Sequence, residues 1–561
     1  MNAVLVLIIG FIVFIIGYRV YAKYVDTRIV KADPKKATPA KLYMDGVEFM
    51  PTSKNILFGY QFKSIAGAGP VLGPIIALQW GWVPALIWVL LGTLFIGWVQ
   101  DYSSAMAAMR HEGASMGGLS HKLISPRARI ILLAFIYFYL LLIAGAFGAV
   151  VVNTAIGLKG SPMAWLFMTG SGILAGQMIY RWKKDIILTT VVTVLITLFG
   201  IWVGTVAPSN VIIGDKLANS RVLWGILTFL FCYFAAVLPI WRFALPINYV
   251  ASYVVLLGLF FGIIGVFVLH PNLTLPAYTS FTIKIGPIWP IMFVTIACGA
   301  ISGWHSLVSS SGTARQLEFE TDARPVGGGV MFVEMMLALF ALITAGAVFS
   351  SSSEYAAALV KGPAGVFAAG VGKFLNALGL PLKIGTTYGS VMMIFLAVTI
   401  LQLVIRFMRI ATSELLGDIS PIFKNAHIGT LIASLLGILL VFTGWWQYLW
   451  VLFGGANQLM ASLALMLISA WLMSEGKNYI WALLPMIFML VTTIGALLYT
   501  SYGLLQKVFT GAVKGEALIG NTIMGLVGFF LVVAALILAI EGIKAFKRYI
   551  AIKAQPAPAK A

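Results

Sequence analysis

Three ionisable residues stand inside long apolar stretches of this 561-residue sequence, and they are its best candidates for chemistry. They are Asp101 in "GTLFIGWVQDYSSAM", His305 in "CGAISGWHSLVSSSG" and Glu334 in "GGGVMFVEMMLALF". Charge in such surroundings is costly and usually marks a pathway for a substrate or ion. A carboxylate among apolar groups can hold a proton near neutral pH, and imidazole titrates close to it. We therefore predict that Glu334, His305 and Asp101 carry protons.

Each of these three residues also has a structural interpretation, and both interpretations stay open. Glu334 can pair with a neighbouring cation, and His305 can simply hydrogen-bond to the hydroxyl groups beside it. Asp101 can gate the inner mouth of a pathway or anchor the end of a helix.

Two segments around these residues are unsuited to continuous helix. "SIAGAGPVLGPIIALQW" (64–80) contains Gly67, Gly69, Pro70 and Gly73 within a few residues, and proline removes a backbone donor and clashes with the preceding turn. "CGAISGWHSLVSSSG" (298–312) is rich in glycine and serine. Broken backbone at membrane depth persists only where it is buried in protein or lines a wet cavity.

Broken helices of this kind build substrate sites in secondary transporters, where a half-helix N-terminus attracts a carboxylate. We predict a substrate site formed by the residues of both segments together with an adjacent lysine: Gly67, Gly69, Pro70, Gly73, Ser302, Gly303, His305, Ser309 and Lys63. Tight helix packing explains the small residues as well, and a membrane lysine often only extends its ammonium group toward water.

The composition restricts the class of protein. The chain is 61% hydrophobic and only 10% charged, so it is predicted to be an all-α polytopic membrane protein. No nucleotide-binding loop, hydrolase motif, metal-ligand spacing or cofactor site occurs, so we expect no enzyme activity, metal or cofactor.

Fifteen apolar stretches of roughly 20 residues are candidate spans. They lie near 2–18, 64–80, 83–109, 128–150, 161–180, 185–206, 222–240, 246–269, 287–310, 327–350, 386–408, 428–444, 448–473, 480–501 and 520–541. With the N-terminus outside, the inner segments hold 28 of the 37 Lys and Arg residues and the outer segments hold 9. This bias predicts an outer N-terminus and a cytoplasmic C-terminus. It also explains the net charge of +19 as a topology signal that favours anionic lipid, and we expect no nucleic-acid partner.

The order of these features predicts five regions. We expect a first helix and basic cytoplasmic loop (1–63), core helices (64–350), an extracytoplasmic loop with an amphipathic helix at 362–380 (351–385), C-terminal helices (386–545) and a cytoplasmic tail (546–561). Arg406 and Arg409, one turn apart at an inner helix end, are predicted to anchor that helix in the membrane surface. Asn457 and Gln458 are predicted to cross-link helices.

Five stretches resemble the carbon starvation protein A family of bacterial inner-membrane transporters. They are "SIAGAGPVLGPIIALQWG" (64–81), "VQDYSSAMAAMRHEGASMGGL" (99–119), "IACGAISGWHSLVSSSG" (296–312), "FETDARPVGGGVMFVEMM" (319–336) and "LFGGANQLMASLALML" (452–467), in the family's order. The resemblance implies uptake of pyruvate or short peptides during carbon starvation, with protons as the coupling ion. It also implies a core of two inverted five-helix repeats, each with a broken first helix, and places the family's Gln-Asp on Gln100 and Asp101 and its mid-helix Glu on Glu334.

The sequence departs from the family pattern at two places. Relatives commonly have Gly-His-His-Phe where this chain has "GYQF" (59–62) followed by Lys63, and an acidic residue where it has Gln402. These departures leave the coupling ion, proton or sodium, and the substrate open.

We therefore expect a secondary active importer of a small carboxylate or short peptide in the bacterial plasma membrane. A channel or a nutrient-sensing receptor is the alternative, and an intramembrane enzyme is a third. Accumulation against a gradient separates a transporter from a channel, and chemical change of the compound would reveal an enzyme.

Overall fold

The computed structural model describes residues 1–554, and the helices in it account for nearly all regular structure. The predicted tail (546–561) is only partly within that range: helix α23 continues through Ala554, and residues 555–561 lie outside the described residues. The α-helices, with their bounds, are α1 Ala3–Ile16, α2 Pro39–Leu42, α3 Lys54–Ile65, α4 Gly69–Ala77, α5 Trp82–Gly92, α6 Trp98–Arg110, α7 Met116–Leu123, α8 Pro126–Gly157, α9 Ser161–Gly176, α10 Ile186–Val206, α11 Ser209–Ala218, α12 Arg221–Val237, α13 Ala244–Leu269, α14 Phe293–Thr295, α15 Gly303–Ser311, α16 Val330–Gly346, α17 Ser352–Lys361, α18 Pro363–Asn376, α19 Leu382–Leu416, α20 Ala426–Thr443, α21 Trp446–Ser474, α22 Ile480–Phe509 and α23 Glu516–Ala554.

Shorter turns of other helical types connect or extend these helices. They are η1 Gly17–Ala22, η2 Val25–Val30, η3 Thr93–Gly97, η4 Gln177–Arg181, η5 Ile240–Arg242, η6 Ile288–Met292, η7 Thr313–Arg315, η8 Glu320–Asp322, η9 Arg324–Gly329 and η10 Pro421–Lys424. The strands β1 Thr282–Ile283 and β2 Gly286–Pro287 form one small hairpin.

Within the described residues, eleven helical segments are long and apolar enough to cross a membrane, or up to thirteen if two bent pairs each count as one span. The protein is therefore an all-α, multi-pass membrane protein. The predicted number of fifteen is larger because it counted 64–80, 161–180, 222–240 and 287–310 as single spans. The first and last are divided by breaks, and the α-helices of the other two, α9 and α12, are only 16 and 17 residues long.

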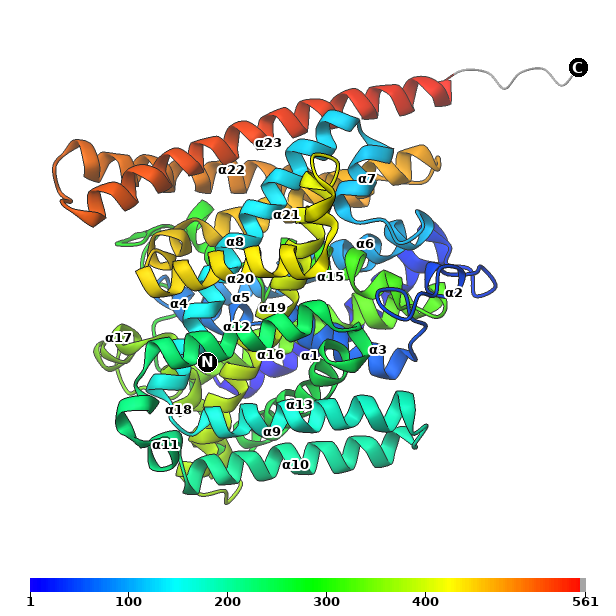
Figure 1. Ribbon diagram of the computed structural model, residues 1–561. Coiled ribbons are helices and arrows are strands. Elements are labelled where there is room, and N and C mark those ends of the chain that lie inside the picture. Colours follow the sequence, from blue (N-terminus) through cyan, green and yellow to red (C-terminus); the bar gives the residue numbers. More distant parts are fainter. Residues whose placement is uncertain (555–561) are drawn as a thin grey trace, which may run out of the picture.

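The most buried helices lie at the centre of the bundle. The apolar windows of α16 and α19 are 94% and 100% buried, while that of α10 is 33% buried. Figure 1 shows α22 and α23 side by side along one edge and α9 with α10 along the opposite edge. Glu334, which lies on α16, is therefore on a helix that is enclosed by other helices.

The predicted amphipathic helix at 362–380 is present as α18, which follows α17 after a bend of 119°. Six residues form its predicted apolar face. Five of them, Val366, Phe367, Val371, Phe374 and Leu375, are buried where α18 contacts α16 and α19, whereas Leu378, beyond the end of α18, is exposed. The helix therefore packs on the bundle with this face inward.

Candidate transport site

The three predicted proton carriers meet at one buried imidazole ring. Nδ1 of His305 lies 2.9 Å from Oδ2 of Asp101, and Nε2 of the same ring lies 3.3 Å from Oε2 of Glu334. All three side chains are 0–1% exposed. Asp101 and His305 are 204 positions apart in the sequence, and the fold brings both together with Glu334 into one buried cluster of ionisable groups.

Each member of this triad comes from a different element beside a break or an irregular turn. His305 lies in the first turn of α15, directly after the second broken segment, and Asp101 lies in the first turn of α6 after the π-helical turn η3. Glu334 lies just over a turn into α16, which follows the glycine-rich turn η9. The irregular segments that precede α6, α15 and α16 let the first turns of these three helices converge on one point.

Several acceptor atoms around the triad have no hydrogen-bond partner within the described chain. They include Oδ1 of Asp101, both carboxylate oxygens of Glu334 and Oε1 of Gln100. Buried polar atoms are nearly always paired, so such a cluster indicates a place for a proton, a water molecule or a ligand. This is the strongest local sign of function in the protein.

The first predicted break lies between α3 and α4, where residues 66–68 leave the helix. The Nζ atom of Lys63 donates a hydrogen bond of 2.9 Å to the carbonyl oxygen of Ala66, which the break has released. Lys63 is 0% exposed. The sequence predicts that Lys63, at the start of the Gly-Pro segment, either attracts an anion or extends its ammonium group toward water. Its side chain is instead enclosed beside the broken backbone.

The second predicted break lies between α14 and α15, at residues 296–302. Side chains from other helices donate hydrogen bonds to the carbonyl groups of this break. Nε2 of Gln458 donates to the Ile296 carbonyl at 3.3 Å, and Nε2 of Gln100 donates to the Ser302 carbonyl at 2.6 Å. The break is thus buried and hydrogen-bonded, as broken backbone at membrane depth must be.

The two breaks cross at close range. A Cβ atom added at Gly69 would lie 2.5 Å from Sγ of Cys298, and one added at Gly73 would lie 2.7 Å from the carbonyl oxygen of Thr295. A Cβ atom at Gly299 would lie 3.3 Å from Cα of Pro70. Close packing accounts for glycine at these positions. The contacts of these glycines therefore agree with the packing interpretation given above.

Asn457 holds the start of α15. Its Oδ1 accepts hydrogen bonds from the Trp304 amide at 3.2 Å and from the Ser302 hydroxyl at 3.1 Å. Gly303 packs against the α21 backbone, where an added Cβ atom would lie 2.7 Å from the Ala461 amide nitrogen. The predicted cross-linking by Asn457 and Gln458 is confirmed, and in this conformation the α15 N-terminus is capped by Asn457.

Ser309, the remaining predicted site residue, lies one turn beyond His305. Its hydroxyl accepts a hydrogen bond of 3.1 Å from Nε2 of Gln61 on α3, and the same amide accepts from Thr313. Gln61 stands in the sequence that departs from the family pattern, and here it joins α3 to α15.

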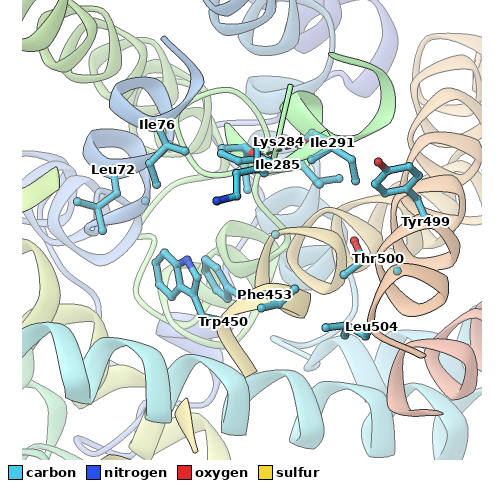
Figure 2. Close-up of a pocket in the computed structure, with 18 of the residues that line it drawn as sticks. Leu72, Ile76, Lys284, Ile285, Ile291, Trp450, Phe453, Tyr499, Thr500 and Leu504 are labelled. Atoms are coloured by element: carbon cyan, nitrogen blue, oxygen red, sulfur yellow. Dashed lines mark hydrogen bonds between the residues drawn. The ribbon is translucent and has the colours of Figure 1, made fainter. Parts of the chain in front are cut away.

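A cavity of about 610 Å³ reaches both breaks (Figure 2). Gly69, Ala297 and Cys298 lie on its wall at the breaks, and Leu72, Trp450 and Phe453 form apolar walls. Of the nine predicted substrate-site residues, Gly69 and Gly73 line this cavity. The other seven are buried and do not line it: Gly67, Pro70, Ser302, Gly303, His305, Ser309 and Lys63.

Ion pairs join several segments at the other end of the bundle. Nε of Arg110 lies 2.9 Å from Glu320 and its NH1 lies 3.6 Å from Glu475, and Glu48 pairs with both Arg406 and Arg409. Arg406 is 1% exposed, so its predicted role as a membrane anchor is wrong. The reason is that the loop before α3 folds back and brings Glu48 to it.

Gln100, Tyr139 and Thr93 contribute to the site but had no predicted role in binding. Gln100 donates to the second break, the Tyr139 hydroxyl donates to Asn457, and the Thr93 hydroxyl donates to the Gly299 carbonyl. Polar residues in apolar helices were the available signal, but many such residues occur and their partners are distant in sequence.

Comparison with known proteins gives a consistent result. The model of the family described as "Carbon starvation protein CstA" matches residues 2–357 and 347–496. A peptide transporter CstA of Bacillus subtilis (strain 168) is 29% identical, with 95% of this chain and 96% of that protein covered. A peptide transporter CstA of Escherichia coli (strain K12) is 30% identical, with 88% and 80% covered.

Two further similarities are to another transporter, over part of the chain, and to a solved structure. The pyruvate/proton symporter BtsT of Escherichia coli (strain K12) is 33% identical over 358 residues, which cover 61% of this chain and 49% of that protein. A crystal structure of the Eremococcus coleocola manganese transporter is 13% identical, with a TM-score of 0.47 and coverage of 90% of this chain and 99% of that one. The family match and the two full-length relatives agree with the motifs in the sequence, and the chain belongs to the carbon starvation protein CstA family.

Proposed function

We propose that this protein is a secondary active importer that couples inward proton movement to the uptake of a small carboxylate such as pyruvate, or of short peptides. The relatives named above are a peptide transporter and a pyruvate/proton symporter, which supports both substrate classes and the coupling ion. The observation that carries the proposal is the buried triad of Asp101, His305 and Glu334 beside two broken helices.

In this proposal Glu334 is the proton carrier and His305 is its exchange partner. Glu334 has two unpaired carboxylate oxygens in a site without solvent, so charge on it is costly and protonation relieves that cost. Asp101 holds the imidazole ring from the other side. A change in the protonation of Glu334 would therefore alter the contacts between α15 and α16, which is the coupling that transport requires.

Substrate binding is proposed at the crossing of the two breaks. The amide groups of Gly67 and Ala68 donate no hydrogen bond within the described chain, so they are available to a carboxylate. Gly69, Pro70 and Gly73 continue this wall, and the Nζ atom of Lys63 lies beside it at the Ala66 carbonyl oxygen. Ser302, Gly303 and Ser309 would become accessible when Asn457 releases the start of α15.

The cavity at the breaks and the ion pairs at the opposite end support alternating access. The cavity opens beside Lys284 and Lys507, on the side that the charge distribution assigns to the exterior. Segments assigned to the cytoplasm meet in the ion-pair cluster, because Arg110 contacts Glu320, Glu475 and the Lys31 carbonyl. We propose that this conformation faces outward, with the N-terminus outside and the C-terminus cytoplasmic in a bacterial plasma membrane.

Transport into reconstituted vesicles tests the proposal. Labelled pyruvate and labelled dialanine would each be offered with an imposed proton gradient, with an imposed sodium gradient and with neither. We expect accumulation above the external concentration only when the outside is acidic. Equilibration without accumulation would indicate a channel, and sodium-driven accumulation would assign the coupling to sodium.

A further inference from the structure

The mouth of the cavity in Figure 2 carries positive charge without any negative partner. Lys284, from the β1–β2 hairpin, and Lys507, from the last turn of α22, both line it, and no Asp or Glu is among the lining residues. Neither lysine forms an ion pair within the described part of the chain. Both residues are exposed, so their charges act outward without neutralisation.

The direction of the Lys284 side chain supports a role toward the cavity. Figure 2 shows its ammonium group directed into the space between Leu72 and Trp450 and away from the surrounding ribbon. The hydroxyl-bearing side chains of Tyr499 and Thr500 lie across the space on α22. A carboxylate in the mouth would thus meet cations and hydroxyl donors, which are the groups that stabilise it.

The floor of the same cavity leads to the two breaks. Gly69 and Cys298, whose helices cross there, line it, and the walls between mouth and floor are the apolar side chains of Leu72, Ile76 and Phe453. An apolar channel with cations only at its mouth concentrates small anions at that mouth and gives little attraction to neutral or cationic solutes. The floor residues belong to the proposed transport site, whereas the mouth residues do not.

We propose that Lys284 and Lys507 form an outer docking site for the carboxylate of an anionic substrate, and that this site favours net-negative substrates over zwitterionic ones. The proposal rests on the function proposed above, because it places a first binding step on the outer side of the transport site. The ligand class is a small monoanion carrying a carboxylate. The two lysines lie at the mouth and not at the breaks. Their attraction for the carboxylate therefore speeds capture of the substrate and leaves the transport step unchanged.

The test is uptake by vesicles containing wild-type protein or the variant Lys284→Gln, Lys507→Gln or the double variant. The substrates are pyruvate and three dipeptides of net charge −1, 0 and +1: alanyl-glutamate, dialanine and alanyl-lysine. Lys514→Gln is the matched control, because Lys514 is an exposed lysine in the same α22–α23 region and does not line the cavity. Each measurement is made at low and at high ionic strength.

We expect the double variant to raise the KM for pyruvate and alanyl-glutamate about three- to tenfold at low salt, with kcat unchanged. The KM for dialanine should stay within about twofold, and the difference should shrink at high salt because mobile ions screen exposed charges. Equal changes for all net charges, no change in KM, or the same change in Lys514→Gln would overturn the docking site. If the wild-type protein carries only pyruvate, the salt dependence of its KM decides whether the docking site exists. If it carries only peptides, the comparison of the three net charges decides. Absence of gradient-driven uptake of every substrate by the wild-type protein would instead refute the proposed function.

Discussion

Nε2 of His305 lies 3.3 Å from a carboxylate oxygen of Glu334, and both side chains are completely buried. The contact is within ion-pair distance, yet neither of these atoms has a hydrogen-bond partner within the described chain. Moving a proton between the two groups would change the attraction between α15 and α16. This relationship makes Glu334 the residue whose replacement is most informative.

Replacing Glu334 by Gln should abolish proton-driven accumulation and leave exchange of substrate across the membrane intact. Glutamine keeps the shape of the side chain but cannot release a proton, so the coupled step is lost while binding remains. The measurement compares uptake under an acid-outside gradient with exchange of labelled for unlabelled pyruvate in loaded vesicles. Accumulation retained in Glu334→Gln would remove this residue from the coupling mechanism.

Asp101→Asn and Glu334→Gln should show strongly non-additive effects on uptake. Both residues contact the same ring, at 2.9 Å and 3.3 Å, so each single change disables the same unit. We expect each variant to lower the initial rate of proton-driven uptake by about tenfold or more, and the double variant to lose little beyond that. Rates that multiply in the double variant would show that the two carboxylates act independently.

Sequence patterns were sufficient where the physical cause is local. A charge within an apolar stretch is costly wherever the fold places it, so Asp101, His305 and Glu334 could be selected without knowing that they meet. Clustered glycine and proline disrupt a helix regardless of its neighbours, so both breaks could be located. The family motifs then supplied the class of protein, which membership of the CstA family confirms.

Pairings between distant segments could not be predicted in the same way. Whether Lys63 faces water or the Ala66 carbonyl depends on how α3 is enclosed by other helices, and Arg406 is buried because a loop brings Glu48 to it. Hydropathy gave fifteen candidate spans, more than the eleven to thirteen helical segments that are long and apolar enough by themselves, because it does not register where broken helices stop. The roles of the site residues remain predictions until transport is measured.

Gly303→Ala should lower the yield of folded protein, because an added methyl group has no space there. Its Cβ atom would meet the Asn457 carbonyl oxygen and lie 2.7 Å from the Ala461 amide, and backbone atoms of α21 cannot move aside as a flexible side chain could. We expect a loss of stability of about 1–3 kcal/mol. The measurement is the melting temperature of purified protein in detergent.

Gly170→Ala is the matched control for this change. Gly170 also lies within a helix, but a Cβ atom added there meets nothing within 4 Å. Alanine is the better helix former, so this variant should be as stable as the wild type or slightly more stable. Equal melting temperatures for the two variants would show that α15 and α21 do not pack as closely as described.

The ion pairs of Glu48 should make the stability of this end of the bundle depend on pH. Burial alone raises the pKa of the Glu48 carboxyl, but Arg406, Arg409 and Arg315 outweigh it, and the pKa lies below its usual value. A carboxyl group whose pKa is lower in the folded state adds stability that is complete above the unfolded pKa, about 4.3, and is lost as the pH falls through the folded pKa. At pH 7 the contribution of Glu48 is therefore fully present.

Glu48→Gln should consequently lower the melting temperature at pH 7 and matter progressively less as the pH falls below about 4. The cost at pH 7 is expected to be about 3 kcal/mol, because Arg406 stays buried without its carboxylate. Glu112→Gln serves as the control, since Glu112 and Lys122 form an exposed pair that solvent screens. A melting temperature of Glu48→Gln that matches the wild type at pH 7, or a deficit that persists unchanged into acid, would contradict the role assigned to this pair in holding the loop before α3 against α19.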